Sequence, residues 1–243
     1  MTDFAGRSVV VTGGTGGIGG AISLAFKAAG ASVIAAGLGD EELIARRNDA
    51  AFAGIRIESL DVSDASAVAA FAATIDHCDH LVNYAGMLVR GGDAFADDVF
   101  TRTLEVNTMG TLRMSRSLLP QLEASGHGAV VNFASMLAIF GSATAPAYAA
   151  SKGAVAQLTK SMAIAWAPKH VRVNAVAPGW IDTPMSTSAK GTPEMSARIV
   201  ARTPLGDWGR PEHLAGPVMF LCSDAAAWVT GAVLPVDGGY SIA

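Results

Sequence analysis

The chain has 243 residues, of which 51% are hydrophobic and 16% are charged, and its formal net charge is -4. A chain of this size and apolar content can bury one large α/β core, and the low charge predicts that further surface is buried between subunits. The small negative charge gives no reason to expect nucleic acid or an anionic membrane as a partner. No apolar stretch reaches the length of a membrane span, and the acidic start does not resemble a signal peptide, so we expect a cytoplasmic protein.

Short β-branched segments alternate with alanine-rich segments along the chain. The predicted strands cover residues 8–12, 32–36, 55–60, 81–83, 129–133, 171–175 and 232–236. The predicted helices cover residues 17–29, 64–74, 97–123, 147–167 and 211–222. Continuously apolar strands that alternate with helices indicate a parallel sheet covered on both faces. We therefore expect an α/β fold, a doubly wound Rossmann sheet of seven strands, in a single domain spanning residues 1–243.

The stretch 183–209 breaks this alternation. It contains scattered Gly, Pro, Ser and Thr residues and one short helical segment. Loops of this length in a compact domain are usually functional lids or disordered. We expect this stretch to be a substrate loop or lid.

A glycine-rich turn follows the first predicted strand and opens the first predicted helix, with the sequence TGGTGGIG at residues 12–19. Glycine lets the backbone turn sharply and lets a pyrophosphate approach the free N–H groups at the positive end of the helix. Two spacings fit: Gly14, Gly16 and Gly19 match the general G-x-G-x-x-G pattern, and Gly13, Gly17 and Gly19 match a longer turn. A merely flexible turn is the alternative, and the strand before and the helix after the glycines argue against it.

Tyr148 and Lys152 lie four residues apart in a predicted helix, so they share one face and can address one ligand. A free phenol has a pKa of about 10, and a fixed positive charge nearby lowers that pKa. Tyr148 can then donate a proton to a carbonyl oxygen or remove one from an alcohol. Ser135 follows the predicted strand 129–133, and ligands of open parallel sheets bind at the carboxyl ends of the strands. A chance Tyr/Lys pair on a surface helix is the alternative, which the glycine turn and Ser135 disfavour.

With these residues in place, the sequence resembles the short-chain dehydrogenase/reductase family, in its branch of about 250 residues, over nearly the whole chain. The turn of Thr12, Gly13, Gly17 and Gly19 is similar to the family's cofactor turn, which selects the second glycine spacing. Further matching segments are Asp61-Val62 (the adenine-contacting pair), Asn83-Tyr84-Ala85-Gly86 (after the fourth strand), Pro178-Gly179 with Thr183 (beside the nicotinamide) and Asp237-Gly238-Gly239 (a C-terminal signature). Tyr84 replaces the second Asn of the family's Asn-Asn-Ala-Gly segment, a difference that concerns packing of the sheet rather than the chemistry.

The resemblance implies an NAD(P)-dependent oxidoreductase that moves hydride between the nicotinamide and a ketone or secondary alcohol. It implies that Ser135 orients the substrate oxygen and that Tyr148 exchanges the proton. Lys152 would hold the nicotinamide ribose and lower the tyrosine pKa, and Asn107 would hold a water that continues the proton path. The expected cofactor-binding residues are Gly13, Thr15, Gly17, Ile18, Gly19, Gly37, Leu38, Asp61, Val62, Asn83, Ala85, Gly86, Tyr148, Lys152, Pro178, Gly179, Ile181 and Thr183.

The cofactor preference is expected to be set near Gly37, at the end of the second strand. No acid is placed there to grip a ribose diol, and no basic residue is placed there to bind a 2′-phosphate. Arg46 and Arg47 follow on the next helical stretch and could fold back, whereas Asp40, Glu41 and Glu42 would repel a phosphate. We expect NAD(H) to be preferred over NADP(H).

Several apolar residues flank the catalytic set, namely Met87, Leu88, Ile139, Phe140, Trp180, Ile181 and Met185. Pocket lining is one interpretation, and ordinary core packing is the other. We expect Ser135, Leu137, Tyr148, Trp180 and Met185 to contact the substrate, a small hydrophobic ketone or secondary alcohol.

The resemblance implies that the chemistry needs no metal, and the histidines show no ligand spacing and are expected to be ordinary structural residues. Cys78 and Cys222 lie far apart and are expected to be reduced, buried thiols. The resemblance implies that the helices 97–123 and 147–167 pair into a dimer and that the C-terminal strand region completes a homotetramer.

Two other functions compete with this interpretation. A nucleotide-binding sensor without turnover would use the same fold, and a damaged Ser/Tyr/Lys set would be its expected sign, whereas the set here is intact. An epimerase or dehydratase with transient hydride chemistry is the second, but such relatives usually have a larger C-terminal substrate region.

Overall fold

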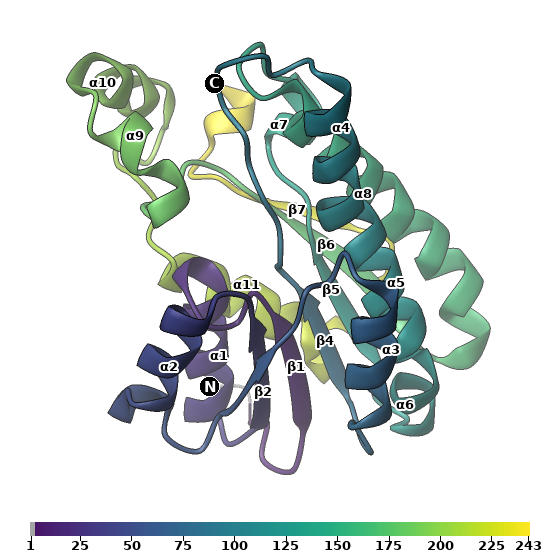
Figure 1. Cartoon of the computed structure of the whole chain (residues 1–243). Helices are drawn as coiled ribbons and strands as arrows, with labels where there is room; N and C mark the ends of the chain where they lie inside the picture. Colours follow the sequence, from purple (N-terminus) through teal and green to yellow (C-terminus); the bar gives the residue numbers. More distant parts are fainter. Residues whose placement is uncertain (1–2) are drawn as a thin grey trace.

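One seven-stranded sheet forms the centre of the computed structural model, which describes residues 3–243 (Figure 1). All neighbouring strands are parallel, in the order β3-β2-β1-β4-β5-β6-β7. The strands are β1 (Ser8–Thr12), β2 (Ser32–Gly37), β3 (Arg56–Ser59), β4 (His80–Asn83), β5 (Ala129–Phe133), β6 (Arg172–Pro178) and β7 (Val233–Val236). The strand order runs outward in opposite directions from the neighbouring strands β1 and β4, and open parallel sheets bind ligands in the crevice at such a switch point. The predicted seven-stranded parallel sheet is therefore confirmed.

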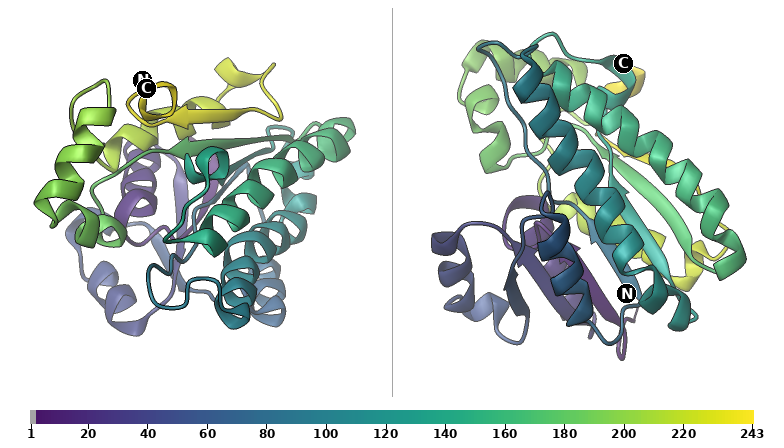
Figure 2. Two further views of the ribbon diagram at one scale, coloured as in Figure 1. Left: turned by 90° about the horizontal axis from the view of Figure 1, so that it is seen from above. Right: turned by 45° about the vertical axis from the view of Figure 1, so that its right-hand side comes forward.

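Helices cover both faces of the sheet, as the views in Figure 2 show. One face carries α1 (Gly17–Ala28) and α11 (Glu212–Cys222), and its buried cluster includes Val9, Val11 and Ile22. The opposite face carries α3 (Ala65–Ala73), α5 (Gly110–Ser117) and α8 (Pro146–Trp166) over a second cluster. Alternate residues of β1 point into the two clusters, because successive side chains of a strand face opposite sides. This is why the buried strands carry apolar side chains toward both faces of the sheet.

The predicted single helix over residues 97–123 is wrong. The structure divides it into α4 (Asp97–Leu104), a π-helical turn η2 (Glu105–Met109), α5 and α6 (Leu119–Ala124). Pro120 lies in the first turn of α6, where its missing N–H is tolerated, and it cannot continue the preceding helix. The π turn leaves no mark in the apolar periodicity, and such turns are often found at functional sites.

The segment 183–209 is more helical than predicted. It contains η4 (Pro184–Ser186), α9 (Thr187–Lys190) and α10 (Pro193–Arg202), where one short helical segment was expected. Figure 1 shows α9 and α10 standing away from the sheet at the end where the chain leaves β6. Ala189, Ile199 and Trp208 form a small buried cluster of their own, packed against Trp180.

The remaining elements follow the main pattern. They are α2 (Asp40–Arg47) after β2, the short α7 (Leu137–Phe140) after β5, and the 3-10 turns η1 (Ala50–Phe52), η3 (Ala167–Lys169), η5 (Asp224–Ala226) and η6 (Tyr240–Ile242). Cys78 and Cys222 are both buried free thiols, as predicted. Across residues 3–243, none of the helices combines the length and the apolar character needed to cross a membrane.

Candidate active site

The glycine turn forms a cradle of bare backbone before α1. Gly13 and Gly17 have φ values of +66° and +53°, in the region that L side chains rarely adopt. A Cβ on Gly19 would lie 2.1 Å from the carbonyl oxygen of Gly13, so this close packing also requires glycine. No side chain caps the start of α1, where Gly16 is the N-cap residue. The backbone N–H groups at this helix end are therefore placed to receive an anion.

A large pocket opens at this turn, along the carboxyl ends of β1, β2 and β4. It holds about 1250 Å³ of empty space, its open mouth included. Ten of the residues predicted to bind a cofactor line it: Gly13, Thr15, Gly17, Gly37, Leu38, Asp61, Val62, Ala85, Gly86 and Thr183. The pocket is also lined by Glu42, Ser63 and Arg102, which were not predicted. The residue pattern along the chain does not show toward which pocket a side chain on a helix or loop points.

Asn83 does not line this pocket. Its amide is buried and donates to Ser115 Oγ at 2.8 Å and to Asn132 Oδ1 at 2.9 Å. Asn132 in turn donates to Thr159 Oγ1 at 2.9 Å. The side chain of Asn83 therefore ties β4 to β5 and α5, and Asn83 is not among the residues that line either pocket.

Glu42 and Arg46 of α2 both reach back to the glycine turn. Glu42 accepts a hydrogen bond from Thr15 Oγ1 at 2.7 Å, and its carboxylate lines the large pocket. Arg46 Nε donates to the Thr15 carbonyl oxygen at 2.6 Å, and its guanidinium also pairs with Asp49. The predicted folding back of Arg46 is thus seen, but it is the acid that faces the pocket.

A second pocket joins the first and contains the residues with catalytic character. Tyr84, Gly86, Thr183 and Met185 line both pockets, so one cleft runs from the glycine turn to the second pocket. Predicted residues that line this second pocket are Ile18, Ser135, Leu137, Tyr148, Lys152, Pro178, Gly179, Trp180, Ile181 and Met185. We call it the reaction pocket.

The side chains of Ser135, Tyr148 and Lys152 meet in the reaction pocket. Ser135 follows β5 and its hydroxyl accepts a hydrogen bond from the Leu137 N–H at 3.1 Å. Lys152 is buried; its Nζ donates to the Phe133 carbonyl oxygen at 2.7 Å and lies 5.5 Å from the centre of the Tyr148 ring. Tyr148 and Lys152 are on one face of α8, as their spacing predicted.

Burial controls the protonation of this set. It raises the pKa of Tyr148 to about 12; Tyr84 acts in the same direction, while the Ser135 hydrogen bond and the Arg90 charge oppose it. Burial also lowers the pKa of Lys152 to about 8, because the ammonium loses water. The expected lowering of the tyrosine pKa by Lys152 is not found here, since desolvation of the phenol outweighs the charges around it.

Asn107 lies in the π turn η2, fully buried beside the reaction pocket. Its Oδ1 accepts from the Met87 N–H at 2.8 Å, and its Nδ2 donates to the Met87 carbonyl oxygen at 3.0 Å and to Ser151 Oγ at 2.9 Å. A Cβ on Gly86 would lie 3.1 Å from Asn107 Oδ1 and 3.7 Å from Lys152 Nζ. Asn107 thus connects the segment after β4 to α8 next to the lysine.

Tyr84 packs against the glycine turn and lines both pockets. Its ring packs edge-on against Phe133 with centroids 4.9 Å apart, and its atoms lie within 3.0 Å of the Cβ positions that Gly13 and Gly19 lack. Burial raises the pKa of its phenol, and the backbone N–H of Ile18 acts against this. The residue that sequence analysis assigned to packing therefore forms a wall of both pockets.

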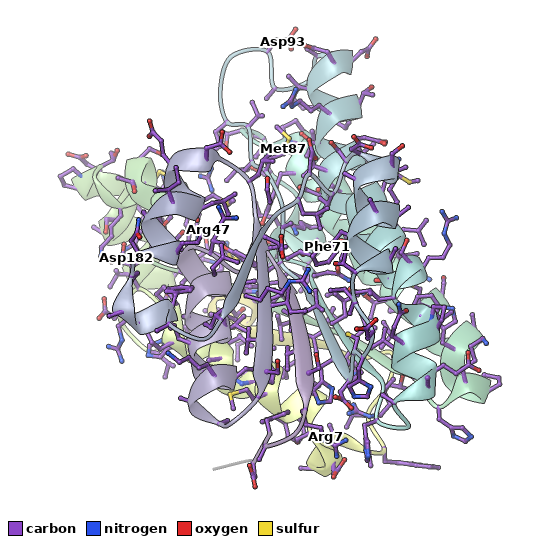
Figure 3. The ribbon with its side chains drawn as sticks, turned by 60° about the horizontal axis from the view of Figure 1, so that its bottom comes forward. Arg7, Arg47, Phe71, Met87, Asp93 and Asp182 are labelled. Atoms are coloured by element: carbon purple, nitrogen blue, oxygen red, sulfur yellow. The ribbon has the colours of Figure 1, made fainter. Side chains whose placement is uncertain are left out.

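The other flanking apolar residues divide between the two pockets and the surface. Leu88 lines the reaction pocket, and Met87 lines the pocket of the glycine turn. Ile139 and Phe140 are exposed on α7. Met87 is half-buried, whereas Asp93 is exposed and lies at the outer end of the molecule (Figure 3).

The cleft fits a nicotinamide dinucleotide in its shape and in its donors. The glycine cradle is open to a pyrophosphate, the apolar walls of Leu38 and Val62 suit a base, and the buried lysine lies where the two pockets meet. Within the described residues 3–243, no three or more His, Cys, Asp or Glu side chains are grouped so as to hold a metal ion.

Comparisons with known proteins agree with this geometry. The family model described as enoyl-(acyl carrier protein) reductase matches residues 13–241. The 2-dehydro-3-deoxy-D-gluconate 5-dehydrogenase of Pseudoalteromonas atlantica is 38% identical over 97% of this chain and 96% of its own length. The galactitol 2-dehydrogenase (L-tagatose-forming) of Cereibacter sphaeroides is 40% identical over 98% of this chain and 96% of its own.

A solved structure extends the likeness to three dimensions. The gluconate 5-dehydrogenase of Burkholderia cenocepacia J2315, in complex with NADP and tartrate, has a TM-score of 0.91 and 31% identity, covering 99% of this chain and 97% of that one. The two relatives are named as dehydrogenases, and this solved structure, also of a dehydrogenase, holds NADP. The chain is therefore a member of the short-chain dehydrogenase/reductase family and an NAD(P)-dependent oxidoreductase.

Proposed function

We propose that Tyr148 is the general acid and base of a carbonyl/alcohol interconversion, with Ser135, Lys152 and Asn107 as its partners. The observation that carries this proposal is the meeting of Ser135, Tyr148 and Lys152 in a pocket continuous with the glycine turn. A bound nicotinamide coenzyme supplies the hydride acceptor or donor for this chemistry.

The chain's own residues divide the remaining work. Ser135 donates its O–H to the substrate oxygen and fixes its position, while the Leu137 N–H holds the serine oxygen in place. In reduction, the protonated Tyr148 donates its proton to the oxygen that gains charge; in oxidation it accepts the alcohol proton. Lys152 is held by the Phe133 carbonyl oxygen, and Asn107 fixes the backbone at Met87. A water beside Asn107 would pass protons from Lys152 to solvent.

NAD(H) is the preferred coenzyme in this proposal. The Glu42 carboxylate lies in the pocket beside the glycine turn, and it would repel a 2′-phosphate while accepting hydrogen bonds from a ribose diol. Leu38 offers no cation at the end of β2. Arg46 is engaged by the Thr15 carbonyl oxygen and by Asp49, so it has local partners already.

The substrate proposed is a small ketone or secondary alcohol with an apolar body. Leu88, Leu137 and Met185 give the reaction pocket an apolar lining. The segment 183–209 would act as its lid, because Thr183 and Met185 line the cleft while α9 and α10 stand outside the sheet (Figure 1). We also propose a homotetramer in the cytoplasm.

The test of the catalytic assignment removes one hydroxyl. Oxidation of NADH with cyclohexanone and a panel of aliphatic ketones and oxo acids is compared between the wild type and Tyr148→Phe. Loss of a positioned acid should lower kcat/KM by about 100-fold to 10,000-fold. Tyr240→Phe is the matched control, because Tyr240 lines neither pocket. Full activity in Tyr148→Phe would overturn the assignment, and coenzyme binding without turnover of any carbonyl would favour a nucleotide sensor.

A further inference from the structure

We infer that the reaction pocket binds an anionic group of the substrate through Arg90 and Trp180, so that the physiological substrate is a hydroxy or oxo acid. This inference rests on the proposed function and names its substrate class. It adds a charged end to the apolar body described above.

Arg90 is a partly buried cation whose partner is missing from the described residues 3–243. Its side chain lines the reaction pocket, and its Nε is buried without a hydrogen-bond acceptor. None of the salt bridges formed within this part of the chain includes it. Burial lowers the pKa of the guanidinium, because the charged group loses contact with water there. A buried charge of this kind is normally paired.

Nearby acids do not supply that partner. No aspartate or glutamate is among the residues that line the reaction pocket. Asp93 is close in sequence, but it is exposed, accepts a hydrogen bond from the Phe95 N–H and lies at the outer end of the molecule (Figure 3). With Lys152 as a second cation, the pocket carries positive charge and no carboxylate of its own.

Trp180 adds a second donor at the same place. The Arg90 guanidinium carbon lies over the Trp180 ring, 5.1 Å from its centre, and the Nε–H of Arg90 has no acceptor among the described residues 3–243. The indole N–H of Trp180 is also buried without an acceptor, whereas that of the adjoining Trp208 donates to Ser196 Oγ at 2.9 Å. A planar anion such as a carboxylate matches these donors.

The position of Arg90 favours a substrate anion over a coenzyme phosphate. Arg90 lines the pocket of Ser135 and Tyr148 but not the pocket of the glycine turn. Its charge also acts on the Tyr148 phenol, so the two groups share one space. In oxidation of a hydroxy acid, the carbinol C–H bond breaks and its electron pair passes as hydride to the oxidised coenzyme. The hydroxyl proton passes to Tyr148, and the carboxylate is unchanged.

The test measures binding apart from turnover. Cyclohexanecarboxylate and the isosteric, neutral cyclohexanecarboxamide are titrated calorimetrically into the enzyme saturated with NADH. The acid should bind at least tenfold more tightly in the wild type, and Arg90→Met should remove that difference. Arg90→Lys should restore part of it, and Trp180→Phe should lose a smaller part. Arg198→Met removes an exposed cation of α10 as the control and should change nothing.

Equal binding of the acid and the amide, equal weakening of both by Arg90→Met, or no binding of either would overturn the inference. Turnover is then compared for 4-oxocyclohexanecarboxylate and its methyl ester, where Arg90→Met should lower kcat/KM for the acid by about 10-fold to 100-fold and leave the ester unchanged. Tyr148-dependent turnover with no preference for the acid refutes the anion site alone. Arg90-dependent binding of the acid without turnover of any ketone refutes the proposed function alone.

Discussion

The protonation state of Tyr148 should make the rates of alcohol oxidation and ketone reduction depend differently on pH. Burial raises the pKa of its phenol to about 12, so the proton donor form prevails at neutral pH. Alcohol oxidation needs the phenolate, whose fraction rises about tenfold per pH unit below the pKa, whereas ketone reduction needs the phenol. We therefore expect kcat/KM for cyclohexanol oxidation to rise steadily from pH 7 to pH 9, while that for cyclohexanone reduction does not rise. A flat oxidation profile would contradict the raised pKa.

Glu42 offers a prediction on coenzyme choice. Replacing it with glutamine removes a negative charge beside the glycine turn and should strengthen NADPH binding by about 10-fold, with a much smaller change for NADH. The matched control is Glu41→Gln, which removes the same charge from a neighbouring exposed position of α2 outside both pockets. Fluorescence titration of both reduced coenzymes gives the dissociation constants. A wild type that binds NADPH tenfold more tightly would refute the preference for NADH.

At the scale of single elements, the π turn η2 should stabilise the fold as well as form part of the site. Asn107→Leu keeps the side-chain volume but leaves the Met87 N–H, the Met87 carbonyl oxygen and Ser151 without this partner. The free energy of unfolding should fall by about 2 to 4 kcal/mol, measured by urea denaturation. Thr108→Val, which removes one 3.2 Å bond to the Ser151 carbonyl oxygen, should cost about 1 kcal/mol. Equal losses of unfolding free energy in the two variants would contradict the prediction that the buried Asn107 amide stabilises the fold more than a single hydrogen bond does.

The elements differ in how far the sequence predicts them. The strands β1 and β5 match their predicted bounds, because a buried parallel strand needs a continuous β-branched run bounded by turn residues. The π turn was missed, and only one of the two helices α9 and α10 was expected, since one widened turn and short helices in a Gly- and Pro-containing loop leave no clear period. Helices that depend on contacts with the rest of the chain cannot be inferred from local pattern alone.

The same division holds for the site. Ser135, Tyr148 and Lys152 follow from spacing and strand ends, which local sequence encodes. The orientations of Glu42 toward Thr15 and of Arg90 over Trp180 depend on how α2 and the segment after β4 pack. These orientations depend on tertiary packing, and the residue pattern within each segment does not predict them.

The whole molecule leaves apolar side chains on its surface that a tetramer would cover. Trp228, just before the edge strand β7, is 101% exposed, and Ile242 near the C-terminal end is 88% exposed. Light scattering should give a mass of four chains, and Trp228→Glu should lower it because a charge cannot be buried cheaply in an interface. Ile44→Glu is the control, since Ile44 is 55% exposed on α2, outside the helices and the C-terminal strand region of the proposed tetramer. A monomer mass for the wild type would rule out this assembly.

Tyr84 has a consequence for how the two ligands influence each other. Its ring lines both the pocket of the glycine turn and the reaction pocket. A movement of that ring on coenzyme binding would change the shape of the reaction pocket, and would thereby couple coenzyme binding to substrate binding. Replacing this ring with the asparagine usual in the family should therefore change the affinity for the coenzyme and the affinity for the substrate together.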